Sequence, residues 1–266
     1  PDLTRYLRQH LWGTIDRMME IAEVAPQDLV AAFEIIEMQQ EFYDRSLEQC
    51  KRNGEPESSA RYEPIVEECH TRIKTQLSRK VEEIQHEVIE HSTGTDMSQV
   101  NIMLHSAAQV LSMITVFKSE VFPCIPPHYN VMETFLTVFE NHFVPQVRKL
   151  CEVENVSKME PKELLQIVDW LEYYHVQVEA YEIREDFVLP SLEIFHVFSE
   201  DLMNEYLSRI KDQVMVWFNN IKNLPLEPLR DSDGTIITTT PNEMFRCLQF
   251  PLSIAQDKLP PEKINS

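Results

Sequence analysis

Apolar residues recur three and four positions apart along most of the chain. One such stripe contains Leu3, Leu7, Leu11, Ile15, Met18 and Ile21. Residues at these spacings share one face of an α-helix, so each stripe predicts an amphipathic helix. Glycine, which destabilises helix interiors, occurs only four times in 266 residues. The sequence therefore predicts an all-α fold.

Further stripes cover most of the remaining sequence. They span residues 29–47, 66–88, 100–121, 131–150, 164–178, 192–221 and 245–252. Together with the first stripe they predict about eight helices, several of them about 20–30 residues long and thus longer than the mean of about 11–12. Long antiparallel helices that pack in sequence order form an elongated rod of consecutive bundles. We expect a first bundle at 1–123 and a second at 124–266, in one continuous rod with a boundary near Pro123–Pro127, as a fragment of a longer chain.

Residues between the stripes carry signals that start and end helices. Pro26 suits the first turn of a helix, and Thr95 can cap the helix that follows it. The clearest start is Thr240-Pro241-Asn242-Glu243, which has the order of a capping box. Pro145 lies inside a helical stripe, where we expect a kink because proline removes a backbone donor. Only residues 224–240, with a β-branched run, look extended.

The charge and cysteine content exclude several classes of protein. The formal net charge of -20 disfavours nucleic acid and direct binding to an anionic membrane. Arg72, Lys74, Arg79 and Lys80 form a local basic patch, which we interpret as a solvated helix face. No apolar run approaches the roughly 20 residues that span a bilayer. The five scattered cysteines, without a CxxC pair, indicate a reducing compartment and no zinc ribbon or disulfide framework.

One pattern could carry metal chemistry. Glu-x-x-His occurs at Glu67/His70, Glu83/His86, Glu172/His175 and Glu193/His196. Carboxylate-bridged di-iron proteins use two such pairs on inward helix faces, with a further glutamate from each of two other helices. These pairs lie off or beside the apolar stripes, so we interpret them as exposed neighbours. The sequence also lacks a P-loop, GxSxG or HExxH motif. It predicts no catalytic residue, no cofactor, no metal site and no enzyme activity.

The segment "VFPCIPPHYN" (121–130) raises a second candidate, a site formed by Cys124 and His128. These residues are four apart, but Pro126 and Pro127 separate them and disfavour helix, so one helical face does not hold both side chains. We interpret the segment as a corner between two helices, in which Tyr129 is a packing residue.

Four segments, in this order along the chain, resemble the exocyst Sec-six family. They are "LWGTIDRMMEIAEVAPQDLVAAFEIIEMQQ" (11–40), "VFPCIPPHYNVMETFLTVFENHF" (121–143), "ELLQIVDWLEYYHVQV" (163–178) and "TTTPNEMFRCLQFPLSIAQD" (238–257). The first has a Leu-Trp helix and a Pro-x-x-Leu start, and the second a Pro-Cys-x-Pro-Pro-x-Tyr corner. Residues 51–95 match the pattern weakly. The segments correspond to a middle portion of a family member.

The resemblance implies a non-enzymatic subunit of the exocyst, the complex that docks secretory vesicles at the plasma membrane before SNARE-mediated fusion. It implies a helical rod that resides in the cytoplasm and is recruited to sites of exocytosis. The implied partners are other exocyst subunits, above all the Sec-eight type, and SNAREs or SNARE regulators. No binding residue can be carried over, because the matching positions look fold-defining.

Two alternatives stay open at this point. A family paralogue could shape membranes outside the exocyst, which would require basic membrane-binding segments that the acidic chain does not show. A carboxylate-bridged metalloenzyme would require the Glu-x-x-His pairs to converge on a metal.

Overall fold

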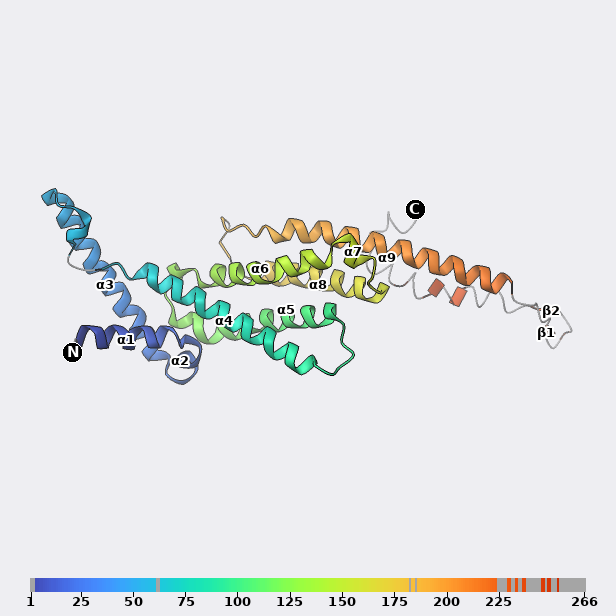
Figure 1. Ribbon diagram of the computed structural model, residues 1–266, viewed down its shortest axis with the longest axis horizontal. Coiled ribbons are helices and arrows are strands. Elements are labelled where there is room, and N and C mark those ends of the chain that lie inside the picture. Colours follow the sequence, from blue (N-terminus) through green and yellow to red (C-terminus); the bar gives the residue numbers. More distant parts are fainter. Residues whose placement is uncertain are drawn as a thin grey trace. The chain divides into compact units, whose positions relative to one another are not determined.

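Figure 1 shows the computed structural model of the chain. The structure describes residues 3–60, 63–181, 183–184 and 186–223, and the short pieces 229–230, 233, 236–237, 245–246, 248–249 and 253. Across these residues it contains nine α-helices and one two-stranded β-ladder. The predicted all-α class is therefore confirmed.

The long elements follow one another in the predicted order. The helices are α1 (Leu3–Ile15), α2 (Met18–Val24), α3 (Pro26–Asn53), α4 (Val66–Ser92), α5 (Gln99–Val116), α6 (Val131–Leu150), α7 (Val153–Val156), α8 (Pro161–Ala180) and α9 (Ser191–Lys222). Strands β1 (Leu229–Arg230) and β2 (Ile236–Ile237) pair antiparallel. Three 3₁₀ turns, Glu57–Ser59, Phe122–Cys124 and Pro127–Tyr129, and a π-helical turn at Phe117–Val121 complete the described elements.

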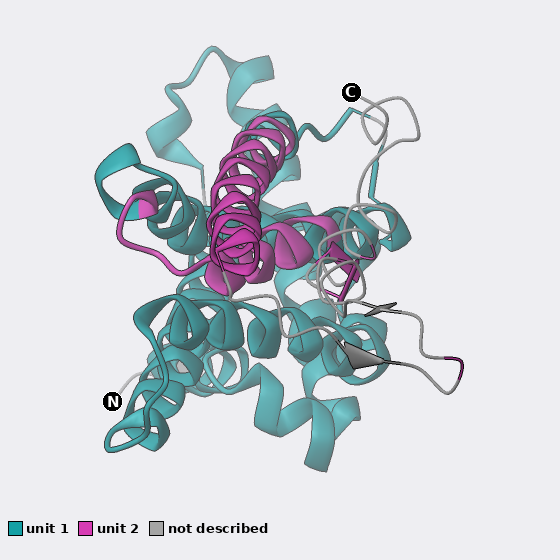
Figure 2. Cartoon of the chain, turned by 90° about the vertical axis from the view of Figure 1, so that its right-hand side faces the viewer, with its two compact units in different colours: residues 1–155, 173–194 teal, residues 156–172, 195–266 magenta. Residues whose placement is uncertain are grey.

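The chain divides into two compact units, coloured separately in Figure 2. The first contains residues 1–155 and 173–194, and the second contains residues 156–172 and 195–266. In the first unit α4 packs against α5 and α6, and α2 packs against α3 and the π-helical turn. The predicted bundles 1–123 and 124–266 describe a different division, which stays a prediction.

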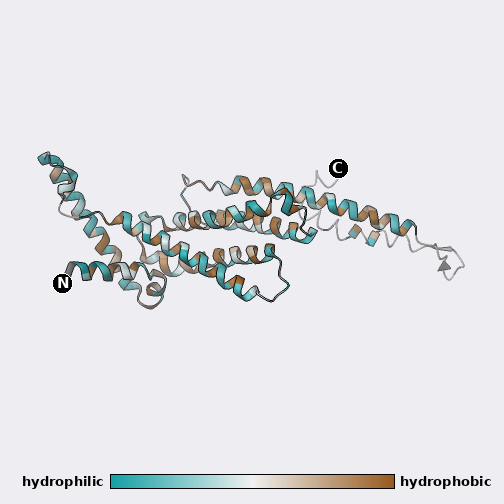
Figure 3. Ribbon diagram, viewed as in Figure 1, coloured by the Kyte–Doolittle hydropathy of each residue, from teal (hydrophilic) through white to brown (hydrophobic). Residues whose placement is uncertain are grey.

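The core of the first unit consists of the apolar stripes seen in the sequence. Figure 3 shows hydrophobic and hydrophilic residues alternating along α4, α5 and α6. The buried residues include Ile73, Leu77 and Val81 of α4, Ala107, Leu111 and Ile114 of α5, and Phe135, Phe139 and Phe143 of α6. Each large side chain buried in this way contributes about 1.5–3 kcal/mol, so these faces hold the helices together.

The second unit contains residues 161–172 of α8 and residues 195–222 of α9. The Trp170 and Phe195 rings lie edge to face, with 6.0 Å between their centroids. Arg209 of α9 donates hydrogen bonds to the backbone carbonyls of Val156 and Met159. Because these carbonyls precede α8, one guanidinium group ties the start of α8 to α9.

The first apolar stripe forms two helices where the sequence predicts one. The chain breaks at Arg17, whose φ of -119° and ψ of 28° lie outside the helical region. Gly13 and Thr14 precede the break, and both have low helix propensity. The break leaves Ile15 and Met18 fully buried on either side of it. This split and the short α7 add two helices to the prediction, whereas the last predicted stripe, 245–252, is not among the nine described α-helices.

The helix caps follow the sequence signals with one correction. Pro26 occupies the first turn of α3, as predicted. The cap of α5 is Ser98, whose side chain accepts a hydrogen bond from the Asn101 N–H at 3.3 Å, so the prediction of Thr95 is wrong. Thr95 donates its hydroxyl hydrogen to the Ser92 carbonyl instead. Thr95 therefore belongs to the turn that follows α4, and α5 begins later, at Gln99.

Pro145 lies within α6, which continues as helix on both sides of it. Residues 229–230 and 236–237 are extended, as predicted for this region. Residues 245–246 and 248–249 have helical backbone, as expected for the last stripe. Residues 240–243, with the predicted capping box, and Leu252 lie outside the described residues.

One helical stretch, Gln99–Cys124, is long and apolar enough to cross a membrane by length and composition, contrary to the expectation from the sequence. Half of its most apolar window is buried inside the protein. Val110, Leu111 and Ile114 on this stretch are almost completely buried. A core helix passes the same test of length and composition, and the packing of α5 accounts for its apolar side chains.

A candidate interaction groove

The structure separates the Cys124 and His128 side chains into different environments. The Cys124 thiol is buried and donates to the Glu120 carbonyl, and burial raises its pKa. His128 is exposed and forms an ion pair with Glu37 at 3.1 Å. A nucleophilic cysteine needs a lowered pKa, so this pair does not have the environment of a catalytic site. Pro127 and Asn130 instead form a corner, with Asn130 at a φ of 50° before α6.

The Glu-x-x-His pairs have other partners. Glu83 binds Arg79 and Lys80. His86 lies 3.3 Å from Glu90, and His175 lies 3.1 Å from Glu179. In both pairs the glutamate follows one turn later on the same helix. The His70 ring lies 5.0 Å from the Tyr129 ring, and burial lowers its pKa.

Glu193 and His196 are both exposed on α9. Among the described residues, no group of three or more His, Cys, Asp or Glu side chains could hold a metal ion.

Carboxylates neutralise most of the predicted basic patch on α4. Arg72 binds Asp16 at 2.7 Å and Glu68 at 3.0 Å, and its guanidinium group lies 4.8 Å from the Trp12 ring centroid. Arg79 and Lys80 both bind Glu83. Arg72 therefore fixes α1 against α4, and the patch offers little free positive charge.

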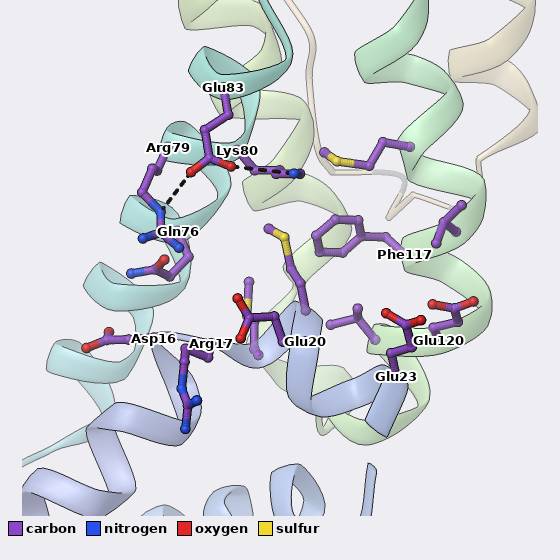
Figure 4. Close-up of a pocket in the computed structure, with 15 residues that line it drawn as sticks. Asp16, Arg17, Glu20, Glu23, Gln76, Arg79, Lys80, Glu83, Phe117 and Glu120 are labelled. Carbon is purple, nitrogen blue, oxygen red and sulfur yellow. Dashed lines mark hydrogen bonds and ion pairs between the residues drawn. The ribbon is translucent and has the colours of Figure 1, made fainter. Parts of the chain in front are cut away.

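A groove with a volume of about 300 Å³ lies between α2, α4 and the end of α5 (Figure 4). Its apolar lining consists of Met18, Met19, Met113, Val116, Phe117 and Val121. Met18, Phe117 and Val121 are buried, and Met113 is half-buried. Methionine side chains are flexible and polarisable, which suits a surface that adapts to a bound apolar group. We call this cavity, with the apolar side chains that line it, the methionine groove.

The two ends of the methionine groove differ in charge. At one end Arg79 and Lys80 are paired with Glu83, as the dashed lines in Figure 4 show. At the other end lie Glu20, Glu23 and Glu120, all exposed, for which no ion pair occurs within the described part of the chain. Figure 4 shows Glu23 and Glu120 side by side. Arg17 also lines the groove and donates to the Gly13 carbonyl, without a carboxylate partner among the described residues, so the three carboxylates outnumber this one positive charge.

Two further features of the wall concern backbone and hydrogen bonding. Phe117, Glu120 and Val121 belong to the π-helical turn that follows α5. Such turns are rare in proteins, and a large share of those that do occur lie at functional sites. Gln76 of α4 also lines the groove, and its buried Oε1 atom has no hydrogen-bond partner among the described residues.

Sequence reasoning did not find this groove. The stripe from Val100 to Val121 predicts a regular helix, and no residue in it announces a π-helical turn. The adjacent pair Met18-Met19 was the one visible signal, but methionine is common in cores.

Comparison of the sequence with known protein families gives one match. The family model described as exocyst complex component Sec6 matches residues 1–260. The chain belongs to this family. The match covers the segments that resembled it in the sequence, and it also includes residues 51–95, where the resemblance was weak. No solved structure gives a significant match to the chain.

Membership in the Sec6 family determines the coarse function. The family consists of components of the exocyst, a vesicle-tethering complex, and it is not an enzyme family. The partners that this family membership implies are other exocyst components.

Proposed function

We propose that this protein is a non-enzymatic subunit of the exocyst and docks secretory vesicles at the plasma membrane through contacts with other proteins. The observation that supports it most directly is the family match over residues 1–260. The fold agrees with this role, since long helices with solvated polar faces offer large surfaces for protein contacts. The protein resides in the cytoplasm and is recruited to sites of exocytosis.

Its proposed partners are the remaining exocyst subunits, above all the Sec-eight type, and SNAREs or SNARE regulators. Neighbouring subunits of a stable complex bury large interfaces, typically about 2,000 Å² or more in obligate assemblies. Ile35 and Met38 are exposed apolar side chains on α3, so the described surface carries apolar groups for such contacts.

Affinity purification of the full-length protein from its own cells tests this function. We expect the other exocyst subunits to be recovered together, in amounts comparable to the tagged chain. The same tag on an unrelated cytoplasmic protein is the control. Recovery of none of them from gently lysed cells would contradict the proposal.

A further inference from the structure

We propose that the methionine groove docks a short amphipathic helix with a basic flank, contributed by another exocyst subunit. The apolar row of this helix would lie on the partly exposed lining side chains Met19, Met113 and Val116. Its Lys or Arg side chains would bind at the end that carries Glu20, Glu23 and Glu120. This inference rests on the proposed function, because the helix comes from a partner in the same complex.

The partly exposed apolar side chains of the groove can contact the apolar row of a helix. Three helical segments, α2, α4 and α5 with its π-helical turn, enclose the groove. Val116 is 50% exposed, and Met19 and Met113 are half-buried, so these three side chains offer apolar surface to a partner. An amphipathic helix laid in a hydrophobic groove buries such a surface with residues spaced three and four apart. The volume of about 300 Å³ accommodates a short row of apolar side chains and not a whole domain.

The charges select the chemistry of the occupant. Glu20, Glu23 and Glu120 are exposed and have no ion pair among the residues that the structure describes. The chain as a whole carries a net charge of -20, so like charge disfavours an acidic partner. A partner helix with Lys or Arg at one end would complement these carboxylates while its apolar row covers the methionines.

The opposite end of the groove sets the direction of the helix. There Glu83 already binds Arg79 and Lys80, so that end has no carboxylate left for another cation. The basic residues of the partner therefore belong at the end that carries Glu23 and Glu120.

A photoreactive benzoylphenylalanine in place of Val116 tests the proposal in the full-length protein within the purified complex. The expected result is a crosslink to one segment of another subunit, with apolar residues three and four apart and Lys or Arg at one end. The control places the same group at Thr115, which is exposed and does not line the groove. We expect no crosslink to that segment from position 115.

Charge reversal tests the electrostatic part. The triple variant Glu20→Lys, Glu23→Lys and Glu120→Lys should reduce the crosslink from position 116 by about tenfold, because like charges would face the basic flank. A matched variant, Glu34→Lys, Glu67→Lys and Glu87→Lys, changes exposed glutamates outside the groove and should leave the crosslink unchanged. Changing the basic residues of the captured segment to Glu should restore the crosslink in the first variant.

The outcomes separate the two proposals. A complex that assembles with no crosslink from position 116, or with a crosslink to an acidic segment or a second copy of this chain, would overturn the groove inference and leave the exocyst function standing. An equal loss in both triple variants would also overturn it, because the effect would then follow total charge. Failure to recover any subunit with the unmodified protein would contradict both.

Discussion

The Tyr174 hydroxyl group donates a hydrogen bond to Oε1 of Glu140 over 3.1 Å. Ser191 also donates to this carboxyl group, so residues from α6, α8 and the start of α9 meet at one acid. Burial raises the pKa of Glu140, although the hydrogen bonds from Ser191 and Tyr174 act in the opposite direction. The three side chains belong to the first unit and join its sequence-distant segments.

The variant Glu140→Gln tests the energetic role of this carboxyl group. The pKa of Glu140 in the folded chain lies above its ordinary value of 4.5. The folded state therefore holds the proton more tightly, and the stability this provides is full below the unfolded pKa and lost as the pH rises through the folded pKa. Glutamine stays neutral and keeps an acceptor. We expect the melting temperature of the variant, minus that of the wild type, to increase as the pH rises from 4.5 through the raised pKa.

Thermal unfolding of both proteins at matched pH values between 4 and 8 measures this difference. The variant Glu140→Leu is the control, because it leaves the Tyr174 and Ser191 hydroxyl groups without their acceptor. It should lower the free energy of unfolding by about 1–3 kcal/mol. A difference between Glu140→Gln and the wild type that stays constant over this pH range would contradict the role of burial.

The helices could be predicted from sequence because their buried faces repeat at a fixed spacing. Leu29, Phe33 and Ile36 form one predicted stripe, and all three are buried. The break at Arg17 could not be predicted, since Ile15 and Met18 continue the same stripe across it. Tertiary packing decides whether the helix continues or breaks at Arg17, because Ile15 and Met18 would be buried in either case.

The groove was hidden for a related reason. Met18 and Phe117 lie about a hundred positions apart, and only packing of α2 against the π-helical turn brings them together. Ile114, Phe117 and Val121 are three and four positions apart, as in a regular α-helix. The sequence spacing therefore does not reveal the π-helical turn. The corner at 121–130 was predictable, in contrast, because proline acts on its own neighbours in the chain.

Tyr129 stabilises that corner by packing and not by its hydroxyl group. It is 1% exposed, and its ring contacts Phe33 edge to face, with centroids 5.0 Å apart. Its buried hydroxyl group has no hydrogen-bond partner in the described part of the chain. We expect Tyr129→Ala to lower the free energy of unfolding by about 3–5 kcal/mol, whereas Tyr129→Phe should be at least as stable as the wild type.

Urea unfolding followed by circular dichroism measures both changes at the corner. Arg52→Ala is a suitable control, since it removes an exposed ion pair with Glu48 away from the corner and should cost less than about 1 kcal/mol. A loss of 1 kcal/mol or more in Tyr129→Phe would mean that the hydroxyl group has a bound partner, such as a buried water molecule.

Arg209 connects α9 to the residues before α8 in a way that lysine cannot reproduce. Its guanidinium group binds the Val156 carbonyl at 2.7 Å, the Met159 carbonyl, and the Glu205 carboxylate at 2.7 Å. Lysine has a single ammonium group and cannot donate in these three directions with the same geometry. Arg209→Lys and Arg209→Met should both destabilise the second unit, by about 1–3 kcal/mol.

Limited proteolysis shows where the effect of Arg209 falls. We expect faster cleavage between residues 156 and 160 in both variants, because the carbonyl groups of this segment lose their donor. Lys211→Met, at an exposed position two residues further along α9, is the control and should be cut at the wild-type rate. Unchanged cleavage in Arg209→Met would show that other contacts hold the segment.

The cysteines should differ in reactivity according to burial. Burial raises the pKa of Cys69 to about 12 and also raises that of Cys124, and Cys50 is 5% exposed. Cys151 is half-buried. Because the thiolate is the reactive form, a neutral-pH thiol reagent should modify Cys151 before the other three. A Cys247→Ser background removes the remaining thiol, and mass spectrometry of the labelled peptides gives the order. Adding Cys151→Ser should abolish the fast phase, while unfolding in urea should expose all remaining thiols at one rate. Rapid labelling of Cys69 in the folded protein would contradict its burial between α4 and its neighbours.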